Sequence, residues 1–170
     1  MVYKRGFMNK IKIMFVCHGN ICRSPMAEFV LRKMINEAHL EDVVSVASSA
    51  TSREEIWGDV GNPVYPPAAR ELAKHGIDSK GKRAVQLRAD DYEKYDAFIV
   101  MDEKNLKNSL RIFSSDPEGK LKKLMEFTSR GGDVADPWYT DRFDIAYGDI
   151  YEGCLGVMKW IREEIGRRSK

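Results

Sequence analysis

The sequence predicts an α/β fold with a parallel sheet. Short apolar segments alternate with amphipathic helical segments along the chain. The first apolar segment, KIKIMFVC, ends in a nearly continuous apolar run, as is typical of a central parallel strand that is buried on both faces. There is no internal repeat, low-complexity segment or interdomain linker. We therefore expect residues 1–170 to form one domain, with any ligand at the carboxyl ends of the strands.

Four segments are candidate strands, and helical or turn-rich segments separate them. The expected strands are Lys10–Cys17, Val43–Ala50, Asp96–Met101 and Lys120–Phe127. Between the second and third strands, Thr51–Pro67 is rich in glycine, proline and acidic residues, so we expect a loop there.

Helical patterns fill the other intervals. After the first strand, Ser24 suits the N-cap of a helix and Pro25 its first helical position. Met26, Val30 and Met34 then repeat every four residues and give this helix an apolar face. Further helices are expected over Ala68–Gly76, Asp90–Asp96, Glu103–Phe113 and Asp144–Arg168. In the last of them, Gly153 and Gly156 each cost about 1 kcal/mol of helix stability, so packing must hold the helix in place.

Composition excludes several classes of protein. The formal net charge of +2 is too small to indicate nucleic acid or an anionic membrane as the main partner. No apolar run reaches transmembrane length, and the first ten residues lack the apolar core of a secretory signal. We expect residues 1–9 to form a flexible extension. The three cysteines suit a reducing cytoplasm, and their spacing relative to the histidines predicts no metal site.

The segment VCHGNICRSP predicts an anion site. Cys17 and Arg23 frame the residues HGNIC between a buried strand and a helix N-terminus, where backbone N–H groups and the helix dipole can bind an oxyanion. Gly19 permits the turn, and the planar guanidinium of Arg23 can hold two phosphate oxygens. The same field favours a thiolate at Cys17, which would then be a nucleophile. This is not a Walker loop, because the Gly-Lys-Ser/Thr order is absent.

FVCHGNICRSPMAE resembles the signature of the low-molecular-weight protein tyrosine phosphatases. The likeness continues through SSATS, HGI, MDEKNL and ADPWY, in the same order and over nearly the whole chain. It implies a three-layer fold, in which helices flank a four-stranded parallel sheet on both faces. It also implies hydrolysis of phosphotyrosine through a phosphocysteine intermediate, without a metal or other cofactor.

The resemblance also implies roles for individual residues. Cys17 would attack phosphorus, and Arg23 would bind the equatorial oxygens. The implied phosphate-binding residues are His18, Gly19, Asn20, Ile21, Cys22 and Ser24. Within this group Asn20 would hold the shape of the loop and Ser24 would stabilise the thiolate. Cys22 would also be a redox partner of Cys17, forming a reversible disulfide under oxidising conditions; the alternative is a small apolar filler.

A distant segment, ADPWYTD, supplies the expected acid. A phenolate leaves poorly unless it is protonated, so a carboxylic acid near the ester oxygen fits, and Asp136 is the candidate. Trp138 and Tyr139 would wall a slot for an aryl ring. His75, in HGI, matches a family histidine that supports the phosphate loop; a plain helix-terminal histidine is the alternative. Asp102 and Asn105 match family positions and are expected to be structural.

Other functions remain to be weighed against the phosphotyrosine phosphatase. A phosphoarginine phosphatase of the same family would carry threonine where this chain has Ile21. An arsenate reductase on the same fold needs further thiols near the site, and only Cys154 remains. A binding module without turnover would be expected to lack Cys17 or Asp136. The expected ligands are phosphotyrosine proteins, with phosphate, vanadate or sulfate as competing anions. A monomer is the expected state, with a weak dimer as the alternative.

Overall fold

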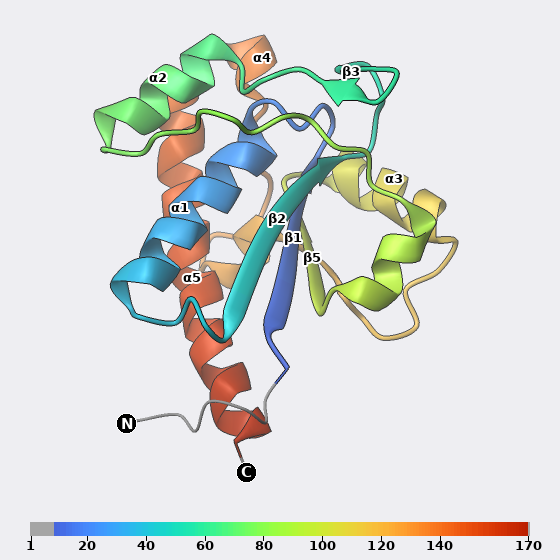
Figure 1. Cartoon of the computed structure of the whole chain (residues 1–170), viewed down its shortest axis with the longest axis vertical. Coiled ribbons are helices and arrows are strands. Elements are labelled where there is room, and N and C mark those ends of the chain that lie inside the picture. The colour runs from blue at the N-terminus through green and yellow to red at the C-terminus, as the bar shows by residue number, and fades with distance from the viewer. Residues whose placement is uncertain (1–8, 170) are drawn as a thin grey trace.

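Four parallel strands form the central sheet (Figure 1). The computed structural model describes residues 9–169, and its sheet strands are β1 (Ile11–Cys17), β2 (Val44–Ala50), β5 (Ala97–Val100) and β6 (Leu121–Lys123). Their order is β2–β1–β5–β6, and all neighbouring pairs are parallel. The predicted four-stranded parallel sheet is therefore confirmed.

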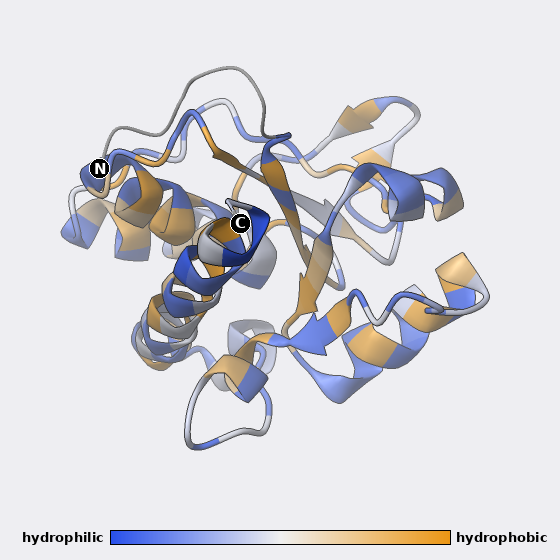
Figure 2. Ribbon diagram, turned by 90° about the horizontal axis from the view of Figure 1, so that it is seen from below, coloured by the Kyte–Doolittle hydropathy of each residue, from blue (hydrophilic) through white to orange (hydrophobic). Residues whose placement is uncertain are grey.

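Helices cover both faces of the sheet, because side chains alternate along each strand. Ile13 and Phe15 of β1 join one apolar cluster with α1 (Arg23–Glu37) and α5 (Phe143–Arg168). Met14 and Val16 face the opposite side, where they pack with aromatic residues of η1 (Ala89–Lys94) and α3 (Glu103–Phe113). A further helix, α2 (Pro66–Lys74), packs against α5 and α1. Figure 2 shows the apolar residues concentrated on the strands and on the helix faces that meet them.

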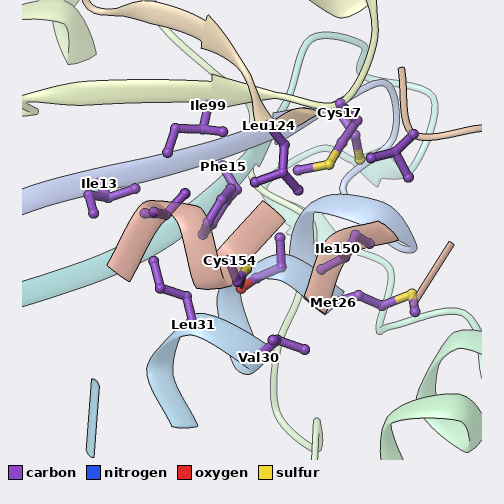
Figure 3. Close-up of a cluster of buried hydrophobic side chains, with 14 of the residues drawn as sticks. Ile13, Phe15, Cys17, Met26, Val30, Leu31, Ile99, Leu124, Ile150 and Cys154 are labelled. Atoms are coloured by element: carbon purple, nitrogen blue, oxygen red, sulfur yellow. Dashed lines mark hydrogen bonds between the residues drawn. The ribbon is translucent and has the colours of Figure 1, made fainter. Parts of the chain in front are cut away.

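The larger cluster joins α1, α5 and the sheet (Figure 3). Met26, Val30 and Leu31 of α1 meet Ile150 and Cys154 of α5 beneath β1, and all five side chains are buried. The expected apolar face of the first helix is thus confirmed. Burial of this surface is the main stabilising term of the fold.

The glycines of α5 permit a close approach by the segment after β6. A Cβ atom at Gly153 would lie 2.4 Å from Leu124 Cγ, and one at Gly156 would lie 2.0 Å from the carbonyl oxygen of Phe127. Leu124 and Phe127 bound η2 (Leu124–Phe127), a short 3₁₀ helix. The two glycines that weaken the helix locally are thus the positions at which η2 packs closely on α5.

Three local predictions are corrected. The segment predicted as the fourth strand, Lys120–Phe127, is a strand only at its start, because its apolar half turns away as η2 to pack on α5. Thr51–Pro67 is not wholly a loop: β3 (Ile56–Trp57) and β4 (Val60–Gly61) pair as an antiparallel hairpin, and α2 begins at Pro66.

The N-cap of α1 is also different from the prediction. Cys22 occupies it, and Ser24 lies within the first helical turn. The hydroxyl of Ser24 contacts Cys17 and Asn20 rather than capping the helix.

Two further expectations can be compared only with the described residues. The predicted N-terminal extension, residues 1–9, lies outside them except for Asn9, whose carbonyl accepts a hydrogen bond from Arg168 Nη1. Among residues 9–169, no helix is both long enough and apolar enough to cross a membrane.

Candidate active site

Residues 17–24, the cysteine loop, join the carboxyl end of β1 to the N-terminus of α1. Cys17 is the last residue of the strand, and Arg23 is the first residue of the helix. The loop turns sharply at Asn20, whose φ of 60° lies in the left-handed region that asparagine tolerates better than most residues. In Figure 1 the loop lies at the top of the view, at the end of the sheet where α4 and β3 are also found.

Asn20 orients the hydrogen bonds around the thiol of Cys17. The backbone N–H of Val85 donates to Asn20 Oδ1 at 3.0 Å, so the amide nitrogen must face the other way. That nitrogen donates to Ser24 Oγ at 2.7 Å and to Ser48 Oγ at 2.9 Å. Since Ser24 Oγ accepts from Asn20, its own proton can point to Cys17 Sγ, 3.0 Å away. The Asn20 backbone N–H also donates to Cys17 Sγ, at 3.3 Å.

A charged cluster around the buried Glu28 lies behind this network. Ser48 Oγ donates to Glu28 Oε1 at 2.5 Å, and Glu28 also pairs with Arg32 and, at 3.6 Å, with Lys82. Burial lowers the pKa of Lys82, while the neighbouring Glu28 carboxylate opposes that shift. No sequence motif indicates this cluster, since its members come from α1, β2 and the segment after α2.

Arg23 is the buried cation of the site, with 2% of its surface exposed. Its Nη1 donates to Asp102 Oδ2 at 2.7 Å and to the carbonyl of Val134 at 2.8 Å. Its Nη2 lies 3.4 Å from Asp136 Oδ2. Burial acts to lower the pKa of Arg23, but the facing Cys17, Asp102 and Asp136 outweigh it, so the pKa is raised above its usual value. Asp102 also caps α3 by accepting from the Asn105 N–H, so its structural role is as expected.

Asp136 reaches the cysteine loop from a distant segment, residues 128–142, here called the aspartate loop. It is the N-cap of α4 (Pro137–Thr140), and its Oδ1 accepts the Trp138 N–H at 3.0 Å. Its other oxygen is the one that faces Arg23. The carboxylate is therefore aimed by a local cap on one side and by an ion pair on the other.

Both loops line one pocket of about 280 Å³. Its lining residues are Cys17, His18, Gly19, Ile21, Cys22, Arg23, Glu54, Glu55, Lys104, Asp136, Trp138 and Tyr139. Most residues predicted for the site are thus brought together. Asn20 and Ser24 lie beneath the pocket wall, almost wholly buried, and Trp138 and Tyr139 stand at the rim with 58% and 85% of their surface exposed.

His75 lies elsewhere, contrary to its predicted support of the loop. It is the C-cap of α2, where its ring stacks on Tyr147 of α5 at 3.7 Å between centroids. Its Nε2 lies 3.4 Å from Glu71 Oε1. Because α2 packs on α5, the ring is drawn to that interface and away from the pocket.

The two cysteines of the loop differ in their surroundings. Cys22 is buried, and that burial, reinforced by the negative charges of Cys17 and Asp136, raises the pKa of its thiol far above the usual range. Cys22 is therefore a neutral thiol at neutral pH. Cys17 has the donors described above, which suit a thiolate.

Glu54, Glu55 and Lys104 line the pocket but were not predicted. The first two lie just before β3, and Glu54 pairs with His18 at 3.0 Å. Lys104 is on the first turn of α3. The only sequence signal for the two glutamates was the acidic character of the segment that contains them.

Comparisons with known proteins agree with this geometry. Residues 12–167 match the family described as low molecular weight phosphotyrosine protein phosphatase. The chain is 32% identical, over 152 residues, to low molecular weight protein-tyrosine-phosphatase PtpA of Staphylococcus aureus, covering 89% of this chain and 94% of that protein.

Solved structures give the same result. YfkJ of Bacillus subtilis superposes with a TM-score of 0.86 and 30% identity, over 94% of this chain and 99% of that one. SP-PTP, the low molecular weight protein tyrosine phosphatase of Streptococcus pyogenes, does so with a TM-score of 0.79 and 32% identity, over 93% and 99% of the respective chains.

Proposed function

The chain belongs to the low molecular weight phosphotyrosine protein phosphatases, and from this premise we propose that it hydrolyses protein phosphotyrosine through a phosphocysteine intermediate. One observation carries the proposal: Cys17, Arg23 and Asp136 line a single pocket. A nucleophile, an anion clamp and a carboxyl group are the three parts that phosphomonoester cleavage at a cysteine requires.

The substrate's phosphoryl group would bind in the cysteine loop. The backbone N–H groups of residues 18–23 and the N-terminus of α1 form the expected cradle. Arg23 adds a guanidinium that is held in place by Asp102 and the Val134 carbonyl. Because its Nη1 is fixed by these two bonds, the guanidinium is oriented before the substrate binds, and Nη2, which faces Asp136 in the free protein, would turn to the phosphoryl oxygens.

The first chemical step would form the phosphocysteine. Cys17 Sγ attacks phosphorus, the bond from phosphorus to the phenolic oxygen breaks, and its electron pair stays on that oxygen. The carboxyl group of Asp136 donates the proton that makes the leaving group a neutral phenol. The Ser24 hydroxyl and the Asn20 N–H support the thiolate before the attack.

The second step would regenerate the enzyme. The Asp136 carboxylate accepts a proton from a water molecule as that water attacks phosphorus. The bond between phosphorus and sulfur breaks, the sulfur leaves as thiolate, and inorganic phosphate is released. The hydrogen bond from Ser24 to Cys17 Sγ also favours departure of that thiolate.

The rim of the pocket suits an aromatic substrate. Trp138 and Tyr139 stand beside Asp136 at its mouth and can flank a phenyl ring. Cys154, by contrast, is wholly buried between α5 and α1 and cannot serve as a relay thiol, so the arsenate reductase alternative is disfavoured.

Cys22 would protect the nucleophile under oxidising conditions. Peroxide would convert the Cys17 thiolate to a sulfenic acid. The Cys22 sulfur would then attack the Cys17 sulfur, and the proton of its thiol would leave with the sulfenic hydroxyl group as water, forming the disulfide. Both thiols line the same pocket, which supports this pairing. The three free cysteines also favour a cytoplasmic location.

The decisive experiment measures phosphate release from para-nitrophenyl phosphate in the presence of EDTA. The wild type should be active, Cys17→Ser should show no measurable turnover, and Cys154→Ala is the matched control that should remain active. Turnover retained by Cys17→Ser would contradict the cysteine mechanism.

A peptide array would then test the substrate class. Phosphotyrosine peptides should be hydrolysed, whereas phosphoserine and phosphoarginine peptides should not; a preference for phosphoarginine would overturn the assignment. Vanadate, phosphate and sulfate should inhibit competitively, because they occupy the same cradle.

A further inference from the structure

Tyr65 connects the two loops of the site, although it does not line the pocket. Its backbone N–H donates to the carbonyl of Ile21 in the cysteine loop at 2.9 Å. Its ring packs against Trp138 in the aspartate loop, with centroids 5.2 Å apart and planes tilted by 50°. The same ring lies 6.0 Å from that of Phe143, where α5 begins. Tyr65 therefore contacts the cysteine loop, the aspartate loop and the first residue of α5.

Besides the hydrogen bond from Arg23 to the Val134 carbonyl and the ion pair of Arg23 with Asp136, the aspartate loop has few anchors near the acid. Val134 is buried before it and binds the Met101 carbonyl through its N–H, and Pro137 is buried after it. The rest of α4 is largely exposed, and this helix has only four residues, too few to be stable without tertiary contacts. Trp138 is one of the three exposed residues of α4, and its ring packs against Tyr65.

We propose that Tyr65 is a positioning residue for the acid: its ring docks Trp138 so that Asp136 is held over the leaving-group oxygen. This rests on the function proposed above. The carboxylate is two residues before Trp138 and receives its N–H, so a displacement of Trp138 moves Asp136 directly. A misplacement of about 1 Å can cost about a hundredfold in rate.

If Tyr65 positions the acid, the rate loss in a Tyr65 variant should depend on how basic the leaving group is. Protonation matters most when the leaving group is a strong base, and least when it is a stable phenolate. A ring that only supports the pocket would affect all substrates alike. The contact is between rings, so phenylalanine should replace tyrosine, while alanine and leucine should not. The backbone bond to Ile21 survives in all three variants.

The test compares kcat/KM for phenyl phosphate and 2,4-dinitrophenyl phosphate in full-length Tyr65→Ala, Tyr65→Leu and Tyr65→Phe. We expect Tyr65→Ala and Tyr65→Leu to lose about tenfold with phenyl phosphate and little with the dinitrophenyl ester, and Tyr65→Phe to match the wild type. Tyr151→Ala, on α5, is the control and should be unchanged. In Trp138→Ala, kcat should likewise fall more with phenyl phosphate than with the dinitrophenyl ester, whereas the lost contact with the substrate ring should raise KM for both.

A double-mutant cycle with Asp136→Asn completes the test. If Tyr65 acts through the acid, Tyr65→Leu should cause little further loss in the Asp136→Asn background. The proposal would be overturned if Tyr65→Leu lost equal kcat/KM with both esters, or if its effect and that of Asp136→Asn were fully additive. It would also be overturned if Tyr65→Leu and Trp138→Ala were both unimpaired. Those results are distinct from failure of the proposed function, in which Cys17→Ser stays active or Asp136→Asn loses nothing.

Discussion

The cysteine loop and the aspartate loop meet in one pocket but are built differently. The cysteine loop is short, nearly buried, and held by bonds from several elements to one asparagine side chain. The aspartate loop is longer and more exposed, and its short α4 touches the body of the protein at few points. The chain thus combines a rigid anion cradle with an acid whose position depends on a small number of tertiary contacts.

This difference separates two requirements of catalysis. Charge stabilisation needs donors that are fixed before the substrate arrives, and the buried Arg23 meets this need. Proton transfer needs a group that can reach the leaving oxygen and later a water molecule, which a loop at the rim can do. The following changes test each side of the comparison.

Replacing Arg23, the phosphate-binding cation of the cysteine loop, should have the largest effect on turnover. Arg23→Lys keeps a positive charge but loses the planar fork, so kcat should fall by about a thousandfold. Steady-state kinetics with para-nitrophenyl phosphate would measure it, with Arg53→Lys as the matched surface control. A loss of less than tenfold would show that the charge alone suffices.

Replacing the acid should have the next largest effect. Asp136→Asn keeps the shape and should lower turnover by about a hundredfold while substrate binding persists. The loss should grow as the leaving group becomes more basic. Asp141→Asn, on the same loop, is the control, and an unchanged turnover in Asp136→Asn would assign the acid to another residue.

The packing of η2, which precedes the aspartate loop, on α5 can be tested by measuring the stability of the protein. Gly156→Ala places a Cβ against the Phe127 carbonyl, so it should lower the free energy of unfolding by about 2 kcal/mol. Gly148→Ala, in the same helix but facing open space, should instead raise it by up to about 1 kcal/mol. Urea titration would measure both. Equal effects would mean that η2 does not need the glycine.

The smallest effect concerns the neutral thiol of the cysteine loop. Folding raises the pKa of Cys22 above its ordinary value of 9.0, so its contribution to stability is complete below that pH and declines as the pH rises above it. Between about pH 8 and about pH 10, the wild type should lose about 1 kcal/mol more unfolding free energy than Cys22→Ala. Parallel urea titrations would show this difference, and identical pH profiles would contradict a raised pKa.

Local patterns predicted most of the architecture. The apolar run before Cys17 predicted the first strand, and the apolar residues at every fourth position from Met26 to Met34 predicted the first helix. Both patterns arise because the buried face of each element must be apolar. The predicted N-cap of the first helix was wrong because the side chain concerned makes other hydrogen bonds. Ser24 was assigned to a helix cap, but the thiol and Asn20 compete for its hydroxyl.

The candidate site was predictable only in part. His75 was drawn to Tyr147 by the packing of α2 on α5, which no local pattern reports. The cluster of Glu28 and Lys82 and the contact between Tyr65 and Trp138 join segments with no motif in common. Such pairs become visible only when the helices have been placed on the sheet.

The sequence by itself determined the alternation of strands and helices and the spacing of Cys17 and Arg23, because both follow from interactions within one short segment. Tertiary structure alone decided that the Asp136 carboxylate pairs with Arg23, and that Trp138 packs on Tyr65. The physical reason is that these contacts join segments far apart in the chain. Their geometry is set by how the helices pack on the sheet and by the buried charge of Arg23, which attracts the carboxylate that the folded loop brings within reach.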